Sequence, residues 1–593
     1  MTRLYALFLI AAVFALCPTL ARASDNTPPK PIVKLGVLVV FDQLRGDYLE
    51  KWRPQFGDDG FKRMQDDGAW FKDCHYPYAT TTTGPGHASI LAGCGPNKHG
   101  IVNNEWYDAK SGETVYCAAL ARYSFVPAPM VQPVDPKSPA MVKKPRLAGA
   151  PDHFLTETVA DQLKLATKGK GKVFGLSLKD RSALLPAGRK PDGVYWFDRR
   201  FVTSTYYRDT LHPWVDTFNK AGLADEFFDK DWVKFKPELD YEKLAGPDDA
   251  PGEGKGTGQG VTFPHPTTGG KKAIGKEYFD ALANTPYGND LLLAFAKECI
   301  VAEKLGTGEN TDLLTLSFSS NDLIGHNWGP DSQEVMDVTL RSDAIMADLL
   351  KFLDDKVGKG KYVVVLTADH GICPLPENSA KNGIDAKRLS PVRLILASEK
   401  HLSEQFGAAK DAPVKEPPVK DPAVKEDEEP ARKKDPSHWI ESVDGPNVYV
   451  NRRLVKAKGL DFDAVTDTLA EFLRTQDGIL RVYNRKQMED AKPSDDAITN
   501  RVKRSYYAER SGDLYVVMKP YYLMESRTTG TTHGAPHSYD THVPLLVFGP
   551  GVPGGVRTEK VTPLHAAPIM ADFIGANQPA DCDYDLPKTL RKK

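Results

Sequence analysis

The sequence has neither a strong excess of charge of one sign nor many cysteines. Its 593 residues contain 77 Lys and Arg against 79 Asp and Glu, which gives a net charge of −2 at pH 7. Nucleic-acid-binding proteins usually carry a strong basic excess, so we expect no nucleic acid as a stable partner. Only 7 cysteines are present, and none stands in a Cys-x-x-Cys or zinc-finger spacing. A metal site in this chain must therefore be built from carboxylates and histidines.

Long hydrophobic runs are also absent, except for one at the N-terminus. Arg3 is followed by a mostly apolar stretch over residues 4–17 and then by Ala21-Arg22-Ala23, a small-x-small cleavage pattern. This order is typical of a signal peptide, which we predict at residues 1–23. An uncleaved membrane anchor is the alternative, but the run of about 14 residues is shorter than the ~20 that spanning needs. We therefore expect a periplasmic or secreted protein without a membrane span after cleavage.

Export also bears on the cysteines. Cys17 lies within the predicted signal peptide, and a lipid anchor there is disfavoured because Leu16 replaces the small residue usual before a lipidated cysteine. The other six cysteines form an even number, which permits disulfides outside the cytoplasm. The sequence leaves their pairing and the oligomeric state open.

Five short apolar runs indicate the fold. Each is rich in Val, Leu and other apolar residues and is near-continuous, which is typical of strands buried on both faces of a parallel sheet. The runs cover residues 34–41, 172–178, 312–318, 361–367 and 543–548. Helical patterns lie between them, for example over residues 331–357 and 460–475. The predicted fold class is α/β, a doubly wound, mostly parallel sheet with helices on both faces.

Two segments look like additions to a single catalytic domain that spans residues 24–593. Residues 186–280 are rich in aromatic residues, Gly and Pro, and are predicted to form loops that cap the sheet. Residues 407–437 combine alternating charges with Pro and contain no aromatic residue. They are therefore predicted to be a disordered, extended insertion. Globular patterning resumes over residues 438–520.

Acidic residues and histidines follow these strands, where ligands of such sheets bind. Three Asp and three His occur in these positions: Asp42, Asp322, His326, Asp369, His370 and His533. Oxygen and nitrogen ligands without sulfur suit Zn²⁺, with Mn²⁺ or Fe as alternatives. Six ligands are too many for one tetrahedral zinc with an open position, but they fit two metals with three ligands each. Two such metals could clamp the attacking and leaving oxygens of an in-line displacement.

A nucleophile candidate lies in a threonine-rich segment. Thr83 is followed by Gly84-Pro85-Gly86-His87, which predicts a tight turn that opens a helix. The N-terminus of a helix attracts anions, and a metal could activate the hydroxyl. Taken alone, the segment would be interpreted as a polar loop rather than as a nucleophile site.

These motifs, in this order, resemble the alkaline phosphatase superfamily over about residues 34–550. Threonine as nucleophile resembles its nucleotide pyrophosphatase/phosphodiesterase branch and the threonine-type alkaline phosphatases. The resemblance implies that Asp42, Thr83, Asp369 and His370 hold one zinc. It assigns Asp322, His326 and His533 to the other, with His533 preferred to His537 and His542 because it precedes a glycine.

The resemblance also addresses the kind of ester. Lys179 and Arg181, together with Asn104 rather than Asn103, match the residues that contact the phosphoryl oxygens in the threonine-type phosphomonoesterases. It implies an exported two-zinc alkaline phosphatase that hydrolyses small-molecule phosphate monoesters through a phosphothreonine on Thr83. The alternative on the same scaffold is a phosphodiesterase or nucleotide pyrophosphatase. A sulfatase is disfavoured because no Cys-x-Pro-x-Arg motif occurs, and a non-catalytic binding protein is disfavoured because all the ligands and Thr83 are present.

Overall fold

The computed structural model describes residues 28–129, 147–411 and 437–590. The predicted signal peptide at residues 1–23 lies outside the described residues. So does most of the predicted insertion at residues 407–437, of which residues 412–436 are not described.

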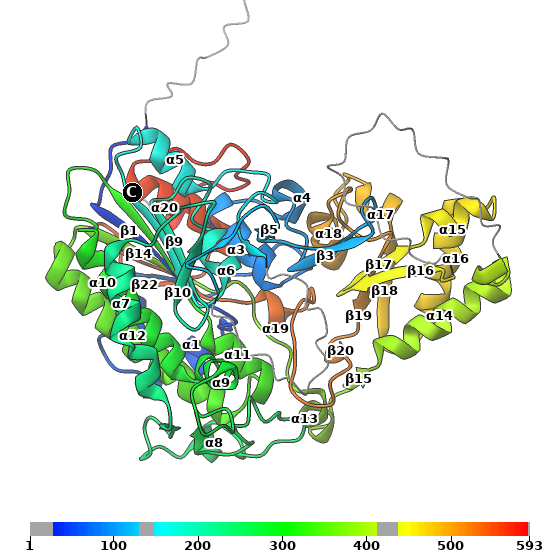
Figure 1. Cartoon of the computed structure of the whole chain (residues 1–593), viewed down its shortest axis with the longest axis horizontal. Coiled ribbons are helices and arrows are strands. Elements are labelled where there is room, and N and C mark those ends of the chain that lie inside the picture. The colour runs from blue at the N-terminus through cyan, green and yellow to red at the C-terminus, as the bar shows by residue number, and fades with distance from the viewer. Residues whose placement is uncertain (1–27, 130–146, 412–436, 591–593) are drawn as a thin grey trace, which may run out of the picture.

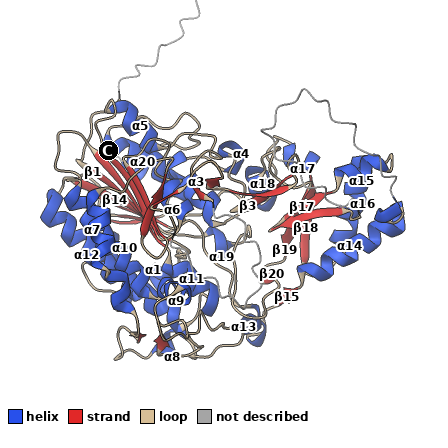
Figure 2. Cartoon of the chain, viewed as in Figure 1, coloured by secondary structure: helices blue, strands red, loops and turns tan. Residues whose placement is uncertain are grey.

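A ten-stranded sheet forms the centre of the larger part of the molecule (Figures 1 and 2). The five apolar runs form five adjacent strands of this sheet, in the order β21-β14-β1-β13-β8. Their bounds are Leu545–Phe548, Tyr362–Thr367, Leu35–Phe41, Asp312–Phe318 and Val173–Ser177. All residues of β1, β8, β13 and β14 are buried, because helices cover both faces. The predicted fold class is confirmed.

The strands β14, β1, β13 and β8 are parallel, whereas β21 runs antiparallel to β14. In the central pairs, Leu35 of β1 lies opposite Asp312 on one side and Tyr362 on the other. The reversal of β21 brings the chain that precedes it, rather than the chain that follows it, to the edge where β1, β13 and β14 end.

Two groups of helices cover this sheet (Figure 1). One group consists of α3, α5, α6 and α20, at Thr83–Ala92, Val159–Ala166, Asp180–Leu184 and Ala566–Ile574. The other includes α7, α10 and the long α12, at Pro213–Ala221, Pro286–Ala302 and Gln333–Leu353. Aromatic and aliphatic side chains of both groups join one continuous core with the strands.

The segment at residues 186–280, which the sequence predicts to cap the sheet, supplies two strands of the sheet itself. Its first strands, β9 at Gly193–Phe197 and β10 at Phe201–Ser204, extend the main sheet beyond β8. Their buried apolar residues explain this position, which the aromatic and Gly-rich composition of the whole segment concealed. The rest of the segment packs against α12, where Asp337 accepts hydrogen bonds from Trp232 Nε1 and the Tyr241 hydroxyl, both at 2.7 Å.

A second, smaller unit lies beside the main sheet (Figure 1). Its four-stranded sheet has the order β16-β17-β19-β18, with bounds Ile440–Asp444, Asn447–Val450, Leu514–Met518 and Ile479–Asn484. The helices α14 (Pro391–Phe406) and α16 (Phe462–Arg474) complete a hydrophobic core of its own. We call the described residues from Pro391, where α14 begins, to Met518, where β19 ends, the inserted unit. The sequence predicts globular structure over residues 438–520 but does not separate it from the catalytic domain.

The six cysteines in the described part of the chain are all free thiols. Five of them are buried and Cys582 is partly exposed. Within the described ranges, no helix combines the length and the apolar composition needed to cross a bilayer.

Candidate active site

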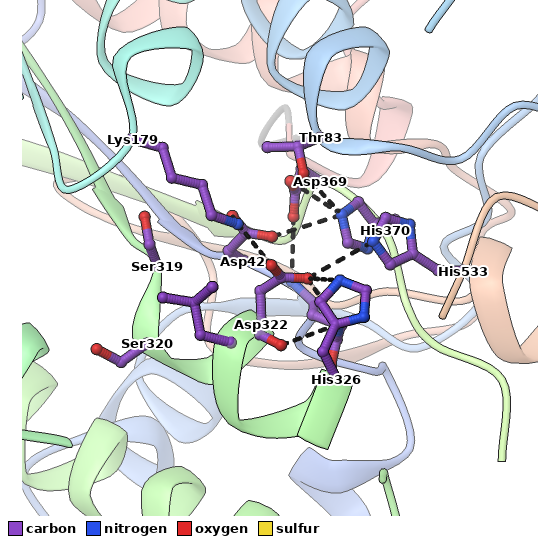
Figure 3. Close-up of polar contacts among 12 residues, drawn as sticks. Asp42, Thr83, Lys179, Ser319, Ser320, Asp322, His326, Asp369, His370 and His533 are labelled. Atoms are coloured by element: carbon purple, nitrogen blue, oxygen red, sulfur yellow. Dashed lines mark hydrogen bonds and ion pairs between the residues drawn. The ribbon is translucent and has the colours of Figure 1, made fainter. Parts of the chain in front are cut away.

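Four neighbouring strands end at one edge of the main sheet, and a charged side chain follows each of them (Figure 3). Asp42 follows β1, Asp369 follows β14 and Lys179 follows β8. Asp322 follows β13 in the first turn of α11, Ser320–Trp328. Because the carboxyl ends of parallel strands meet at the same edge, these side chains converge. His533 reaches the same place from the loop before the antiparallel strand β21.

The six predicted metal ligands form two groups. Asp42, Asp369 and His370 make one, and Asp322, His326 and His533 make the other; within each group the candidate ligand atoms lie within 4.8 Å of one another. The rings of His370 and His533 stack with centroids 3.5 Å apart, so the two groups adjoin. His537 and His542 lie elsewhere and contact the backbone carbonyls of Met518 and Lys72.

All three histidines are held in the same tautomer. Nδ1 of His326 lies 2.8 Å from the carbonyl oxygen of Thr531, Nδ1 of His370 lies 2.9 Å from that of Gly371, and Nδ1 of His533 lies 2.8 Å from that of Thr81. A carbonyl oxygen can only accept, so each Nδ1 carries the proton and donates it. Each Nε2 then has a lone pair, the form in which imidazole binds a metal.

Each of these lone pairs has carboxylate oxygens close to it. Nε2 of His326 is 3.2 Å from Asp322 Oδ1, and Nε2 of His370 is 3.4 Å from Asp42 Oδ1 and 3.3 Å from Asp369 Oδ2. Asp42 Oδ1 is buried and has no hydrogen-bond partner among the described residues. Acceptors that face one another in a buried space are stable with a cation between them, so these residues fit divalent metals with oxygen and nitrogen ligands.

The charge balance supports the same conclusion. Three carboxylates, Asp42, Asp322 and Asp369, are buried together. Burial raises the pKa of Asp42 well above its ordinary value, and the charges of Asp322 and Asp369 raise it further. Lys179 is the ammonium among them, with Nζ 2.6 Å from both Asp42 Oδ2 and Asp322 Oδ2. One ammonium leaves a net negative charge that metal ions would balance.

Thr83 lies at the first position of α3, next to the first ligand group. Its Oγ1 is 3.4 Å from Nε2 of His370, and the side chain is buried. The approach of α3 depends on Gly86, because a Cβ there would lie 2.4 Å from the carbonyl oxygen of Asp369. The segment is therefore a helix start, as predicted, and not only a polar loop.

Asn104 and Arg181 line one cavity near the start of α3. Oδ1 of Asn104 accepts a hydrogen bond of 2.6 Å from the Gly84 amide at the start of α3. Arg181 contacts the Tyr116 hydroxyl at 3.3 Å, and its Nε is buried without a hydrogen-bond partner in the described part of the chain. Both residues line a cavity of about 530 Å³ that also reaches His533.

Two further residues belong to this site: Gln43, which the sequence did not single out, and His87, which the sequence places in the threonine-rich motif without a role. Gln43 donates from its backbone amide to Asp369 Oδ1 at 3.1 Å and from Nε2 to Asp322 Oδ1 at 2.6 Å, so it joins the two ligand groups. His87 joins Thr83 and Asp369, since its Nδ1 lies 2.9 Å from the Thr83 carbonyl oxygen and 3.2 Å from Asp369 Oδ2. The only sequence signals were the position of Gln43 directly after Asp42 and the position of His87 four residues after Thr83.

Comparisons with known proteins identify the family of the chain. The family model "Type I phosphodiesterase / nucleotide pyrophosphatase" matches residues 36–540. The chain is 32% identical to alkaline phosphatase PafA of Elizabethkingia meningoseptica over 584 residues, 96% of each chain. It is also 32% identical to alkaline phosphatase PhoV of Synechococcus elongatus over 568 residues, 94% of each chain.

A solved structure extends the likeness to three dimensions. The crystal structure of wild-type alkaline phosphatase PafA superposes with a TM-score of 0.81 at 31% identity and covers 95% of this chain and 99% of that one. The match therefore includes both the main sheet and the inserted unit. The chain belongs to the type I phosphodiesterase/nucleotide pyrophosphatase family of the alkaline phosphatase superfamily.

Proposed function

We propose that this protein is an exported alkaline phosphatase that hydrolyses small-molecule phosphate monoesters with two zinc ions. One observation carries the proposal: a buried threonine hydroxyl at a helix start lies beside two adjoining groups of metal ligands. Relatives named alkaline phosphatase, similar over nearly the whole chain, support it.

Asp42, Thr83, Asp369 and His370 would hold one zinc, and Asp322, His326 and His533 would hold the other. When bound, the two ions would supply Lewis-acid stabilisation of the negative charge on the attacking and leaving oxygens. The backbone carbonyls of Thr81, Gly371 and Thr531 keep the three imidazoles turned toward this position.

Thr83 is the proposed nucleophile. Its Oγ attacks phosphorus in line as the bond to the substrate's alcohol oxygen breaks, and a phosphothreonine forms. Water then attacks phosphorus and releases phosphate, which restores the hydroxyl of Thr83. The expected transition state is loose, so that position and charge supply most of the acceleration.

Asn104, Lys179 and Arg181 are proposed to bind the non-bridging oxygens. A phosphate monoester carries two negative charges and a diester carries one, so two cationic side chains favour the monoester. The phosphodiesterase alternative remains because the matching family model bears that name. Arg181, at the wall of the cavity, is the residue that separates the two functions.

The test compares kcat/KM for phenyl phosphate and for the matching methyl phenyl diester on zinc-loaded mature protein. We expect kcat/KM to be higher for the monoester than for the diester by several orders of magnitude. In Arg181→Ala, the ratio of the two values should fall about 10²-fold or more. Arg453→Ala, at an exposed arginine of α15 (Arg452–Ala457), serves as the control and should leave the preference unchanged. Faster turnover of the diester would instead establish the phosphodiesterase.

A further inference from the structure

The cavity beside Thr83 has two walls of different origin. The wall at the phosphate side includes Asn104, Arg181 and His533. The opposite wall comes from the inserted unit and the strand that follows it, through the turn after β16 and through β19 and β20 (Tyr522–Met524). We call this space the interdomain pocket. Thr82, the neighbour of Thr83, and His533 line this pocket, so a substrate whose phosphoryl group lies at Thr83 can place its alcohol portion there.

The interdomain pocket is acidic. Its lining contains the carboxylates of Glu105, Asp444, Glu525 and Asp540, and a single cation, Arg181. Glu525 is paired with Arg527 at 3.1 Å. Asp540 is buried, which raises its pKa well above the ordinary value and favours its neutral form. Glu105 and Asp444, in contrast, form no ion pair with any Lys or Arg of the described ranges.

Asp444 is fixed at the end of β16 close to the catalytic side. Its Oδ2 accepts a hydrogen bond of 3.2 Å from Asn103 Nδ2. Asn103 in turn accepts hydrogen bonds from Thr82 Oγ1 at 2.8 Å and from the Asn104 amide at 2.9 Å. Burial raises the pKa of Asp444 to about 7, so the carboxylate is charged in alkaline solution.

The rest of the lining is aromatic and apolar. Tyr116, Tyr515, Tyr522 and Tyr539 contribute to it together with Met518 and Met524. Tyrosine rings attract a cation through their faces, most strongly where water is excluded. Aromatic rings and unpaired carboxylates together match an organic cation or a neutral aryl group, and they oppose an anion.

We propose that the interdomain pocket binds the alcohol portion of the substrate and that Asp444 and Glu105 select its charge. Phosphate monoesters of neutral or cationic alcohols are the favoured class. Monoesters whose alcohol carries a carboxylate or a second phosphate are disfavoured. The inference rests on the proposed function and adds the substrate class to it.

The test uses phenyl phosphate and two para-substituted forms, one with a trimethylammonium group and one with a carboxylate. For each, kcat/KM is measured at pH 8.5 on zinc-loaded wild-type protein and on Asp444→Asn. The kcat/KM for the cationic substrate is then divided by that for the anionic substrate. Effects that are common to all three substrates cancel in this ratio, including the effect of losing the hydrogen bond between Asp444 and Asn103. We expect Asp444→Asn to lower this ratio about five- to tenfold, as the loss of one partly solvated charge pair predicts.

Asp495→Asn is the matched control, because Asp495 is an exposed carboxylate of the same unit outside the pocket lining. An unchanged ratio in Asp444→Asn, or an equal fall for all three substrates, would overturn the inference; the second result would leave Asp444 only a role in positioning Asn103. If Asp444→Asn does not fold, Glu105→Gln tests the same ratio at the second carboxylate. Turnover of unsubstituted phenyl phosphate by the wild type tests the proposed function separately.

Discussion

Gln43 adopts a positive φ of 72°, an uncommon conformation for a residue with a side chain. This conformation directly after Asp42 lets its amide reach Asp369 while its side chain reaches Asp322. Gly325 of α11 leaves the space, since a Cβ there would lie 1.8 Å from Gln43 Oε1. A strained residue that joins both ligand groups is an orienting element of the site.

Replacing Gln43 should therefore weaken metal binding. In Gln43→Ala, Asp322 loses its side-chain donor, whereas the backbone amide of position 43 can still donate to Asp369. We expect zinc affinity to fall about 10- to 100-fold. Titration with a competing chelator, with bound zinc counted by elemental analysis, measures the change. Gln65→Ala is the control, because Gln65 is also buried but donates to the Leu49 carbonyl away from the site. Equal affinities in both variants would contradict the role given to Gln43.

Thr83 gives a prediction that separates binding from chemistry. Thr83→Ala should lower kcat by at least about 10³-fold, while Thr83→Ser should retain much more activity because it keeps the hydroxyl. Rapid acid quenching followed by mass spectrometry should find a phosphorylated peptide with Thr83 in the wild type and none in Thr83→Ala. Phosphorylation at Thr81 or Thr82 instead would identify that residue, and not Thr83, as the nucleophile.

The convergence of the candidate metal ligands was predictable for a physical reason. Asp42, Asp322 and Asp369 each follow an apolar run, and the ends of parallel strands must meet. Gln43 and Asn103 were not predictable in the same way, because their roles depend on one backbone angle and on contact with a distant segment.

At the scale of elements, α3 and the turn after β14 are in unusually close contact. Gly86 permits this contact, because a Cβ at this position would lie 2.4 Å from the carbonyl oxygen of Asp369. That oxygen belongs to the backbone, which cannot move aside as the end of a flexible side chain can. The position of Thr83 therefore depends on a residue without a side chain.

Gly86→Ala should displace α3 from the metal ligands. We expect a loss of about 1–3 kcal/mol in the free energy of unfolding, typical of overpacking, and a fall in kcat of about 10²-fold from the misplaced Thr83. Urea denaturation and steady-state kinetics measure the two effects. Gly308→Ala, where nothing lies within 4 Å of the new Cβ, should change neither. Wild-type kcat in Gly86→Ala would show that the contact is not needed.

Strand existence was predictable here, but strand direction was not. The apolar run at residues 543–548 resembles the other four, yet β21 is antiparallel to β14. Direction depends on how the long preceding segment returns to the sheet, which no local pattern encodes. The aromatic run at residues 193–197 was similarly assigned to a cap because composition over a long window outweighed a short strand signal.

The free energy of unfolding is a property of the whole molecule, and the buried carboxyl group of Glu253 should make it depend on pH. Burial, with the charge of Glu334, raises the pKa of Glu253 to about 9, far above that of an unfolded chain. The stability contributed by the neutral form is complete below about pH 4 and is lost as pH rises toward 9.

Glu253→Gln should therefore gain stability relative to the wild type as pH increases. We expect little difference at pH 5 and an advantage of roughly 2–4 kcal/mol at pH 9, the upper limit being about 1.4 kcal/mol per pH unit. Urea denaturation of the metal-loaded protein at both values measures it. Glu238→Gln, at an exposed position of the same segment, should show no such trend. A constant difference between pH 5 and pH 9 would contradict the assignment.

The inserted unit has a further consequence for the whole molecule. The chain enters it beside β15 (Lys387–Leu389) and returns beside β20, and these two strands pair with each other, Lys387 opposite Tyr522. Entry and exit thus lie side by side. During evolution such a unit can be altered or exchanged as a module, so that its wall of the interdomain pocket can diversify while the main sheet keeps the candidate metal ligands in place.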